Sequence, residues 1–391
     1  MTDWMKEKCA ALVHADCVVV KVGTAVLSTG SALDLNVLDN LVEQLVRLQS
    51  GEDRDGRRRR VVLVSSGAVG AGRVALAEHG KPEAAQAKGL AAKQAIAAIG
   101  QGRLMHFYDQ SFARRGALMA QVLLTRDDLR DRGRFLNIRN TFGSLLDWGV
   151  VPVVNENDTV SVNELKFSDN DNLASLLLNP VEADLFVNLT SIGGVLDANP
   201  QTCPDAQIMP CIEHVRALDL NALCGGKSTL GTGGMYSKLL SASRAAQLGV
   251  PTLILPGREP DVIPRAFAGE QVGTWICAES NPISRRKYWL AYQADPQGVI
   301  HIDAGAAEAL RHKGKSLLPG GISSVEGRFD AGALVRIVHD GQTIGIGLSN
   351  YPAADLELIR GLSRLEVAAK LGDAHYPEVV HRDNLLIDPA C

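Results

Sequence analysis

VPVVNENDTVSVNELKFSDNDN, residues 151–172, joins an apolar run to two clusters of carboxylates and carboxamides. The β-branched valines around Pro152 predict a buried strand that ends near Asn155. Because ligands of α/β proteins bind beyond the carboxyl ends of strands, the acceptor-rich residues that follow predict a site for a polar substrate. The alternative is a pair of Asx turns, since Asn and Asp bond their own backbone in turns. Two dense clusters so close together favour the site.

Strand and helix alternate along the first two thirds of the chain. Apolar runs predict buried strands at 17–22, 61–64, 118–125, 150–154, 183–189 and 250–255, the last one closing this domain. Apolar residues at helical spacing, or alanine-rich composition, predict helices at 34–48, 88–115, 131–148 and 172–178, and a further helix with apolar residues at 239–248 that ends at Gly249. This alternation predicts an α/β fold with a mainly parallel, helix-covered central sheet.

The sequence changes character after Asn281. Short alternating strands at 299–302, 334–338 and 343–348 lie between turn glycines, which predicts a small β-barrel domain beginning near Pro282. Arg285, Arg286 and Lys287 precede Tyr288 and Trp289 and offer charge and stacking surface for RNA, although such a group more often seals a domain junction.

Composition excludes several classes of protein. The net charge of −4 and a pI near 6.2 argue against nucleic-acid binding through a global positive field. Seven cysteines, odd in number and never at CxxC spacing, suggest neither a zinc knuckle nor a disulfide framework, and fit a reduced compartment. Charges interrupt the first 17 residues and no apolar run is long enough to span a membrane. We therefore expect a cytoplasmic protein without a membrane partner.

Lysine and glycine positions predict an anion site. Lys21 interrupts a buried strand, which is costly unless its ammonium group meets an anion; the alternative is an edge-strand lysine that reaches water. Small residues at 65–72 follow the next strand and allow close backbone approach to a phosphate or carboxylate, although their GxxGxG spacing fails the dinucleotide fingerprint. The arginine run 57–60 lies beside acidic residues, and we interpret it as a solvated turn.

A second glycine cluster spans residues 225–238. GGKST at 225–229 lacks the first glycine of a Walker A loop, where Asn221 stands. GTGGMYSK, at 231–238, leads into an amphipathic helix with Lys238 in its first turns. Free amides at such a helix start and the lysine predict an anion site, against the alternative of a plain cap.

In this order along the chain, the motifs resemble the amino acid kinase superfamily. They are KVGTAVLS, SSGAVGAGR, LLTRDDLRDRGRFLNIRNT, VVPVVNENDTV, DNDNL and LGTGGMYSKL. Each motif is modest, but their joint order is specific and covers nearly the whole chain. Within the superfamily the resemblance is to the glutamate 5-kinase branch, and the C-terminal part is similar to a PUA domain. It implies an amino acid kinase domain at 1–280, a PUA-like domain at 283–375 and a tail at 376–391.

The resemblance also implies roles for individual residues. Lys21 and Lys238 would be catalytic and contact the ATP phosphates, and Asp171 would hold both lysines in place. Substrate contacts would come from Ser66, Asp158, Asp169 and Asn170. Nucleotide contacts would come from Lys21, Thr190, Ser191, Thr232, Gly233, Gly234, Met235, Tyr236, Ser237 and Lys238. No protein metal ligand is implied.

Three residues depart from the pattern of that family. Ser191 stands where aspartate is usual, Val195 where tyrosine is usual, and Ala25 where serine is common. The change at Ser191 bears on the expected nucleotide contacts, and implies altered nucleotide preference or reduced activity. The two lysines are unaffected.

The activity implied by the resemblance is ATP-dependent phosphorylation of the γ-carboxylate of L-glutamate to L-glutamyl 5-phosphate, with Mg²⁺, as the first step of proline synthesis. It also implies a dimer or tetramer and proline as a feedback inhibitor. Two alternatives remain: another kinase of the superfamily, acting on acetylglutamate, aspartate, carbamate or uridylate, and an RNA-binding protein that works through the PUA-like barrel. A substrate panel and an RNA-binding test of residues 283–375 separate them.

Overall fold

The computed structural model describes residues 2–30, 32–54, 56–161, 170–200, 202–224, 234–292, 295–371 and 376–387. The chain forms two compact units, Met1–Pro282 and Ile283–Cys391. Each unit has its own apolar core. Among the described helices, none combines the length and apolar character needed to cross a bilayer.

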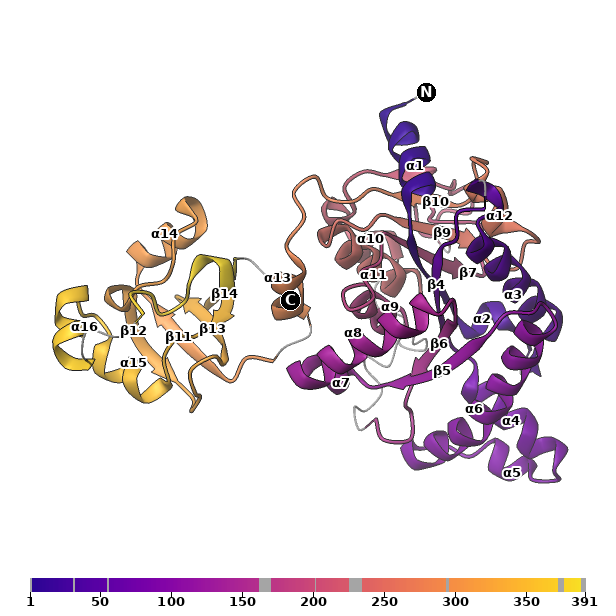
Figure 1. The fold of residues 1–391 in the computed structure, drawn as a ribbon, viewed down its shortest axis with the longest axis horizontal. Helices are drawn as coiled ribbons and strands as arrows, with labels where there is room; N and C mark the ends of the chain where they lie inside the picture. The colour runs from indigo at the N-terminus through magenta and orange to yellow at the C-terminus, as the bar shows by residue number, and fades with distance from the viewer. Residues whose placement is uncertain are drawn as a thin grey trace. The chain divides into compact units, whose positions relative to one another are not determined.

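An eight-stranded sheet runs through the described part of the first unit (Figure 1). Its strands, in spatial order, are β5 (Met119–Leu124), β6 (Val151–Glu156), β4 (Arg60–Ser65), β1 (Cys17–Val22), β7 (Leu185–Thr190), β9 (Thr252–Pro256), β10 (Thr274–Ile276) and β8 (Cys211–Ile212). The pairs from β5 to β9 are parallel, while β10 is antiparallel to β9. The mainly parallel sheet is confirmed. The prediction that 250–255 closes this domain is wrong, because β10 and β8 extend the sheet beyond β9.

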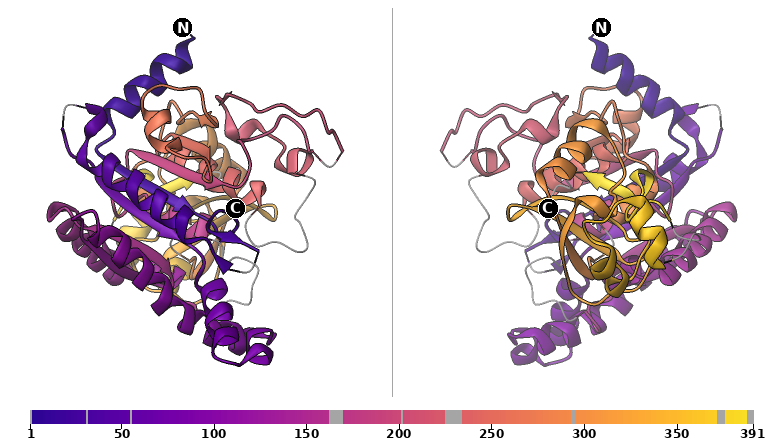
Figure 2. Two further views of the ribbon diagram at one scale, coloured as in Figure 1. Left: turned by 90° about the vertical axis from the view of Figure 1, so that its right-hand side faces the viewer. Right: turned by 90° about the vertical axis from the view of Figure 1, so that its left-hand side faces the viewer.

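Helices cover both faces of this sheet; Figure 1 shows both layers, and the left view of Figure 2 faces the layer that contains α3. One face carries α3 (Leu35–Ser50), α6 (Leu90–Ala113) and α12 (Val262–Phe267), and the other carries α8 (Arg132–Asp147), α9 (Asn170–Leu177) and α11 (Met235–Gln247). Alternate valines of β1 pack with the apolar stripe of α3 in one core cluster, since side chains of a strand point to opposite faces. Both faces of the central strands are therefore buried.

Shorter elements complete the first unit. They are α1 (Asp3–His14), α2 (Thr24–Leu27), β2 (Ser28–Thr29), β3 (Ala32–Leu33), α4 (Ala68–Glu78), α5 (Pro82–Ala85), α7 (Arg126–Arg130), α10 (Leu220–Cys224) and the 3-10 turns Glu52–Arg54 and Val215–Ala217. In the segment that follows the first of these turns, the interpretation of 57–60 as a solvated turn is wrong for Arg59. Its guanidinium group is buried, pairs with Asp53 and donates to the carbonyl of Leu12.

Two glycines allow α4 and α6 to touch through their backbones. A Cβ on Gly100 would lie 1.8 Å from the carbonyl oxygen of Ala68, and one on Gly72 would lie 1.9 Å from that of Ile96. No side chain fits in either place. The contact fixes α6 against the helix that follows β4, and therefore fixes α6 relative to the carboxyl end of the sheet.

The path of the chain creates a topological switch point. From β1 it passes to β4 and the edge strand β5, returns to β6 between them, and then crosses to β7 on the other side of β1. Connections therefore diverge above the adjacent carboxyl ends of β4, β1 and β7. Ligands of open α/β sheets bind in the crevice at such a point.

The second unit contains a sheet with strand order β12-β11-β13-β14-β15. The strands are β12 (Ile322–Glu326), β11 (Gly298–Ile302), β13 (Leu334–His339), β14 (Gln342–Leu348) and β15 (Leu385–Ile387). Helices α13 (Arg285–Tyr292), α14 (Ala304–Lys313), α15 (Ala353–Ile359) and α16 (Arg364–Leu371), and the 3-10 turns Pro319–Gly321 and Arg382–Asn384, complete it. The strand β15, within the segment expected to be a tail, pairs with β14.

Candidate active site

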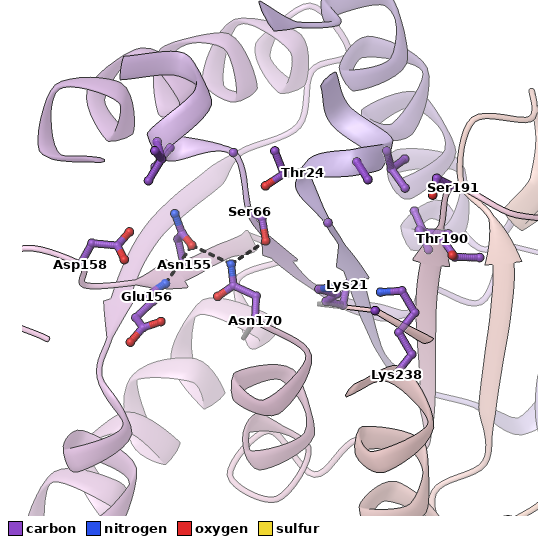
Figure 3. Close-up of a pocket in the computed structure, with 18 of the residues that line it drawn as sticks. Lys21, Thr24, Ser66, Asn155, Glu156, Asp158, Asn170, Thr190, Ser191 and Lys238 are labelled. Atoms are coloured by element: carbon purple, nitrogen blue, oxygen red, sulfur yellow. Dashed lines mark hydrogen bonds between the residues drawn. The ribbon is translucent and has the colours of Figure 1, made fainter. Parts of the chain in front are cut away.

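A cavity of about 610 Å³ opens at the switch point (Figure 3). Residues at or just beyond the ends of β1, β4, β6 and β7 line it, together with the first turns of α2, α4, α6 and α11. Backbone N–H groups at helix starts have no intrahelical partner, so this wall favours anions.

Two lysines from distant parts of the chain meet one buried carboxylate at the base of the cavity. The Nζ atom of Lys21, on β1, lies 2.6 Å from Oδ1 of Asp171, at the start of α9. The Nζ atom of Lys238, on α11, lies 3.2 Å from both carboxylate oxygens. The Asp171 side chain is fully buried and the two lysine side chains are nearly so. The cluster carries two positive charges against one negative charge.

Polar neighbours hold this cluster in one geometry. Asn188, at the register position of β7 that faces Lys21, donates to Asp171 at 2.9 Å and accepts from Lys238 at 3.1 Å. The hydroxyl of Ser237 donates to the other carboxylate oxygen of Asp171 at 2.8 Å. Buried charges are tolerated when they are paired and hydrogen-bonded in this way.

The charges within the cluster shift its pKa values. Burial by itself would raise the pKa of Asp171, but the ammonium groups of Lys21 and Lys238 lower that pKa well below its usual range. Burial lowers the pKa of Lys238, and Asp171 opposes that shift. At neutral pH Asp171 is therefore a carboxylate, and the cluster keeps a net positive charge that faces the cavity.

A carboxamide network forms the middle of the cavity. The Nδ2 group of Asn170 donates to Ser66 Oγ at 2.8 Å and to Asn155 Oδ1 at 3.0 Å, as the dashed lines of Figure 3 show. Asn155 in turn donates to Gln101 of α6 at 2.8 Å. The Oδ1 atom of Asn170 is buried and has no hydrogen-bond partner among the described residues. That acceptor is available to a ligand, because a buried polar atom without a partner is costly.

Two acidic side chains lie at the end of the cavity away from the lysines (Figure 3). Glu156 ends β6 and accepts a hydrogen bond from the hydroxyl of Ser161 at 2.8 Å. Asp158 follows in the turn, and burial raises its pKa. A carboxylate that is partly desolvated in this way is stabilised by a cationic group of a ligand.

The predicted site residues are distributed as follows. Lys21, Ser66, Asp158, Asn170, Thr190, Ser191, Gly234, Met235 and Lys238 line the cavity. Ser237 contacts Asp171 instead, and Tyr236 is not among the lining residues. Asp169, Thr232 and Gly233 lie outside the described residues. Thr190 ends β7 and is buried, whereas Ser191 is exposed.

Sequence reasoning missed three residues that the structure brings to the cavity or its base. Asn188 had a signal, because an amide in the middle of an apolar strand needs a buried partner. Lys93 and Gln94 lie in the first turns of α6 and line the cavity. Their signal was weak, because lysine and glutamine at a helix start are usually solvated.

Comparison with known proteins places the chain in a family. Residues 16–256 match the Amino acid kinase family, and residues 298–371 match the PUA domain. A glutamate 5-kinase of Nitratidesulfovibrio vulgaris (strain DP4) is 63% identical over 387 residues, covering 99% of both chains. Relatives of the same name from Oleidesulfovibrio alaskensis and Geobacter sulfurreducens are 58% and 45% identical and cover at least 95% of each chain.

A solved isopentenyl phosphate kinase is also similar, at 19% identity and a TM-score of 0.44, and covers 66% of this chain and 100% of its own. The PUA-like prediction for the C-terminal part is confirmed by the family match. The chain belongs to the amino acid kinase family and, within it, to the glutamate 5-kinases.

Proposed function

We propose that this protein transfers the γ-phosphoryl group of ATP to the γ-carboxylate of L-glutamate and forms L-glutamyl 5-phosphate, the first step of proline synthesis. The observation that carries the proposal is the buried cluster of Lys21, Lys238 and Asp171 at the base of a cavity whose other end is polar and acidic. The relatives named above support the choice of glutamate as the substrate.

The chemistry requires charge compensation rather than a base. The γ-carboxylate is already ionised at neutral pH, because its reference pKa is about 4.3. One of its oxygens attacks the γ-phosphorus, the bond to the bridging oxygen breaks, and ADP leaves. The ammonium groups of Lys21 and Lys238 offset the charge on the transferring phosphoryl oxygens and reduce the repulsion between donor and acceptor. No covalent enzyme intermediate is needed.

Magnesium is expected to enter with the nucleotide. Within the described ranges, no three His, Cys, Asp or Glu side chains are grouped to hold a metal ion. Asp171 is already engaged by both lysines. Phosphate oxygens and water are the common ligands of Mg²⁺ in kinases, and the ion would supply charge neutralisation on the phosphates.

The remaining roles are those that the resemblance to the family implies. Ser66, Asp158, Asn170 and Asp169 would bind the amino acid, and Thr190, Ser191 and residues 232–238 would bind the nucleotide. Inhibition by proline, a dimeric or tetrameric assembly and a cytoplasmic location stay predictions from the family.

The test is glutamate-dependent release of ADP. The wild-type protein should turn over L-glutamate with ATP and not acetylglutamate, aspartate, carbamate or uridylate. Lys238→Ala and Lys21→Ala should each lower kcat by about 100-fold or more, since one preorganised charge stabilising a transition state contributes on the order of 10² to 10³. Near-normal turnover in either variant would contradict the proposal.

A further inference from the structure

Lys93 is a cationic side chain of the cavity that the phosphoryl-transfer cluster does not use. It lies in the first turns of α6, is half-buried and lines the cavity together with Leu90 and Gln94. In the part of the chain that the structure describes, no hydrogen bond or ion pair engages its ammonium group. A lysine on a solvated helix face needs no explanation, but this one lines a cavity that also holds two carboxylates.

The start of α6 is held in place around Lys93. Gln94 donates to the backbone carbonyl of Ser161 at 3.0 Å, which ties the helix to the turn after β6. Gly89 precedes the helix with a φ of 98° and offers no side chain to cap it. The first backbone N–H groups of α6 therefore have no side-chain acceptor at the N-cap, and their partial positive charge adds to that of Lys93.

The charges of the cavity form three separate regions. Figure 3 shows Lys21 and Lys238 at one end and the carboxylates of Glu156 and Asp158 at the other. Lys93 belongs to the part of the wall that α6 supplies. The substrate of the proposed function also carries three charged groups, namely a reacting carboxylate, an α-ammonium and an α-carboxylate. In the proposed function the reacting carboxylate faces the two buried lysines, and the ammonium group faces the acidic end. Among the described lining residues, Lys93 is then the remaining cation for the α-carboxylate.

We propose that Lys93, with the amino end of α6, binds the α-carboxylate of the amino-acid substrate and makes the site select α-amino acids over simple acids and amines. The proposal rests on the proposed function, because it assumes that the reacting carboxylate lies at the lysine cluster. Lys93 would act in binding and not in phosphoryl transfer, since the α-carboxylate carries the same charge before and during the reaction.

The experiment compares Lys93→Met with the full-length wild-type enzyme. A charge-assisted hydrogen bond contributes enough that its loss should raise KM for L-glutamate about 10- to 100-fold. The kcat value and KM for ATP should change by less than about threefold, as expected when an interaction is equally strong in the ground state and the transition state. Lys93→Arg should restore most of the affinity, because it keeps the charge.

Two competitive inhibitors assign the interaction to one group of the substrate. Glutarate carries both carboxylates but no ammonium, and 4-aminobutanoate carries the ammonium but no α-carboxylate. Lys93→Met should weaken inhibition by glutarate as much as it raises KM for glutamate, and should leave inhibition by 4-aminobutanoate nearly unchanged. Asp158→Asn should weaken inhibition by 4-aminobutanoate and leave inhibition by glutarate nearly unchanged.

Lys88→Met is the matched control. Lys88 is exposed, lies five residues before Lys93 and does not line the cavity. The same loss of charge there should leave KM for glutamate unchanged. An unchanged KM in Lys93→Met, an equal effect in both variants, or an equal effect on both inhibitors would overturn the assignment while leaving the proposed function intact. A wild-type enzyme that does not turn over glutamate would contradict both the proposed function and the role of Lys93. Far-UV circular dichroism checks that each variant is folded.

Discussion

At the scale of single residues, Asp171 should control both the stability and the activity of the first unit. Asp171→Asn leaves Lys21 and Lys238 as two buried like charges, and breaking a buried pair in this way costs about 3 to 5 kcal/mol. Activity should fall as well, because the two ammonium groups lose the group that positions them. The free energy of unfolding in urea and kcat at pH 7 measure the two effects.

The pH dependence of that stability difference follows from the lowered pKa of Asp171. A carboxyl group whose pKa is lower in the folded state contributes stability above its unfolded pKa, about 3.9, and loses it as the pH falls through the folded value. The difference between wild type and Asp171→Asn should therefore narrow as the pH falls below about 4. Asp184→Asn is the control, since Asp184 is exposed and accepts hydrogen bonds from the backbone N–H groups of Asp16 and Cys17. A similar loss in both variants would contradict a special role for the lysines.

Sequence reasoning predicted the two lysines and Asp171 but not the residues that complete their environment. A lysine in an apolar strand and a lysine after glycines each carry a local signal. Asn188 and Lys93 depend on pairing between distant segments, namely β7 beside β1 and α6 above β6. Arg59 also depends on contacts that the local sequence does not reveal. A run of four arginines predicts a solvated turn, but in the fold the guanidinium group of Arg59 is buried against α1 and paired with Asp53.

At the scale of elements, the glycine contact between α4 and α6 should set both stability and the position of Lys93. Gly100→Ala places a methyl group 1.8 Å from a backbone oxygen, which cannot move aside as a side chain can. We expect a loss of about 3 kcal/mol, at the upper end of the usual cost of overpacking. KM for glutamate should rise too, because α6 carries Lys93 and Gln101. Urea unfolding and steady-state kinetics measure both.

The same helix supplies the control. Gly102 is exposed, and a Cβ there has no neighbour within 4 Å. Gly102→Ala should therefore stabilise the protein by about 0.5 to 1 kcal/mol, the usual gain of alanine over glycine inside a helix. Equal effects of the two substitutions would show that the close contact does not matter.

Most long elements could be predicted from the sequence, because apolar periodicity is strong over ten or more residues. The strands predicted at 17–22 and 61–64 agree with β1 and β4 to within one residue at each end. The helices α1 and α14, which have ten or more residues each, were not predicted. The missed strands are short. β10, β12 and β15 have three to five residues each, too few for a period to be recognised, and they exist because neighbouring strands supply their hydrogen bonds.

At the scale of the whole molecule, the described part of the candidate active site lies within one of the two units. Every described residue that lines the cavity belongs to Met1–Pro282. The second unit has a separate core in which Val379, Val380 and Leu385 take part, so residues near its C-terminus contribute to its folding. A test of RNA binding by this unit should therefore use 283–391 rather than 283–375, because the shorter fragment removes β15 and part of the core.

Because the cavity and its supporting core lie in the first unit, we expect residues 1–282 to fold alone and to retain kcat within about threefold of the full chain. The matched control is a fragment that ends at Pro256. It lacks α12 and β10, whose Ile263 and Trp275 are buried in the core of the first unit, and it should fail to fold. Circular dichroism and glutamate-dependent ADP release measure both fragments. A folded but inactive 1–282 fragment would show that the second unit, although it supplies none of the described lining residues, is required for catalysis.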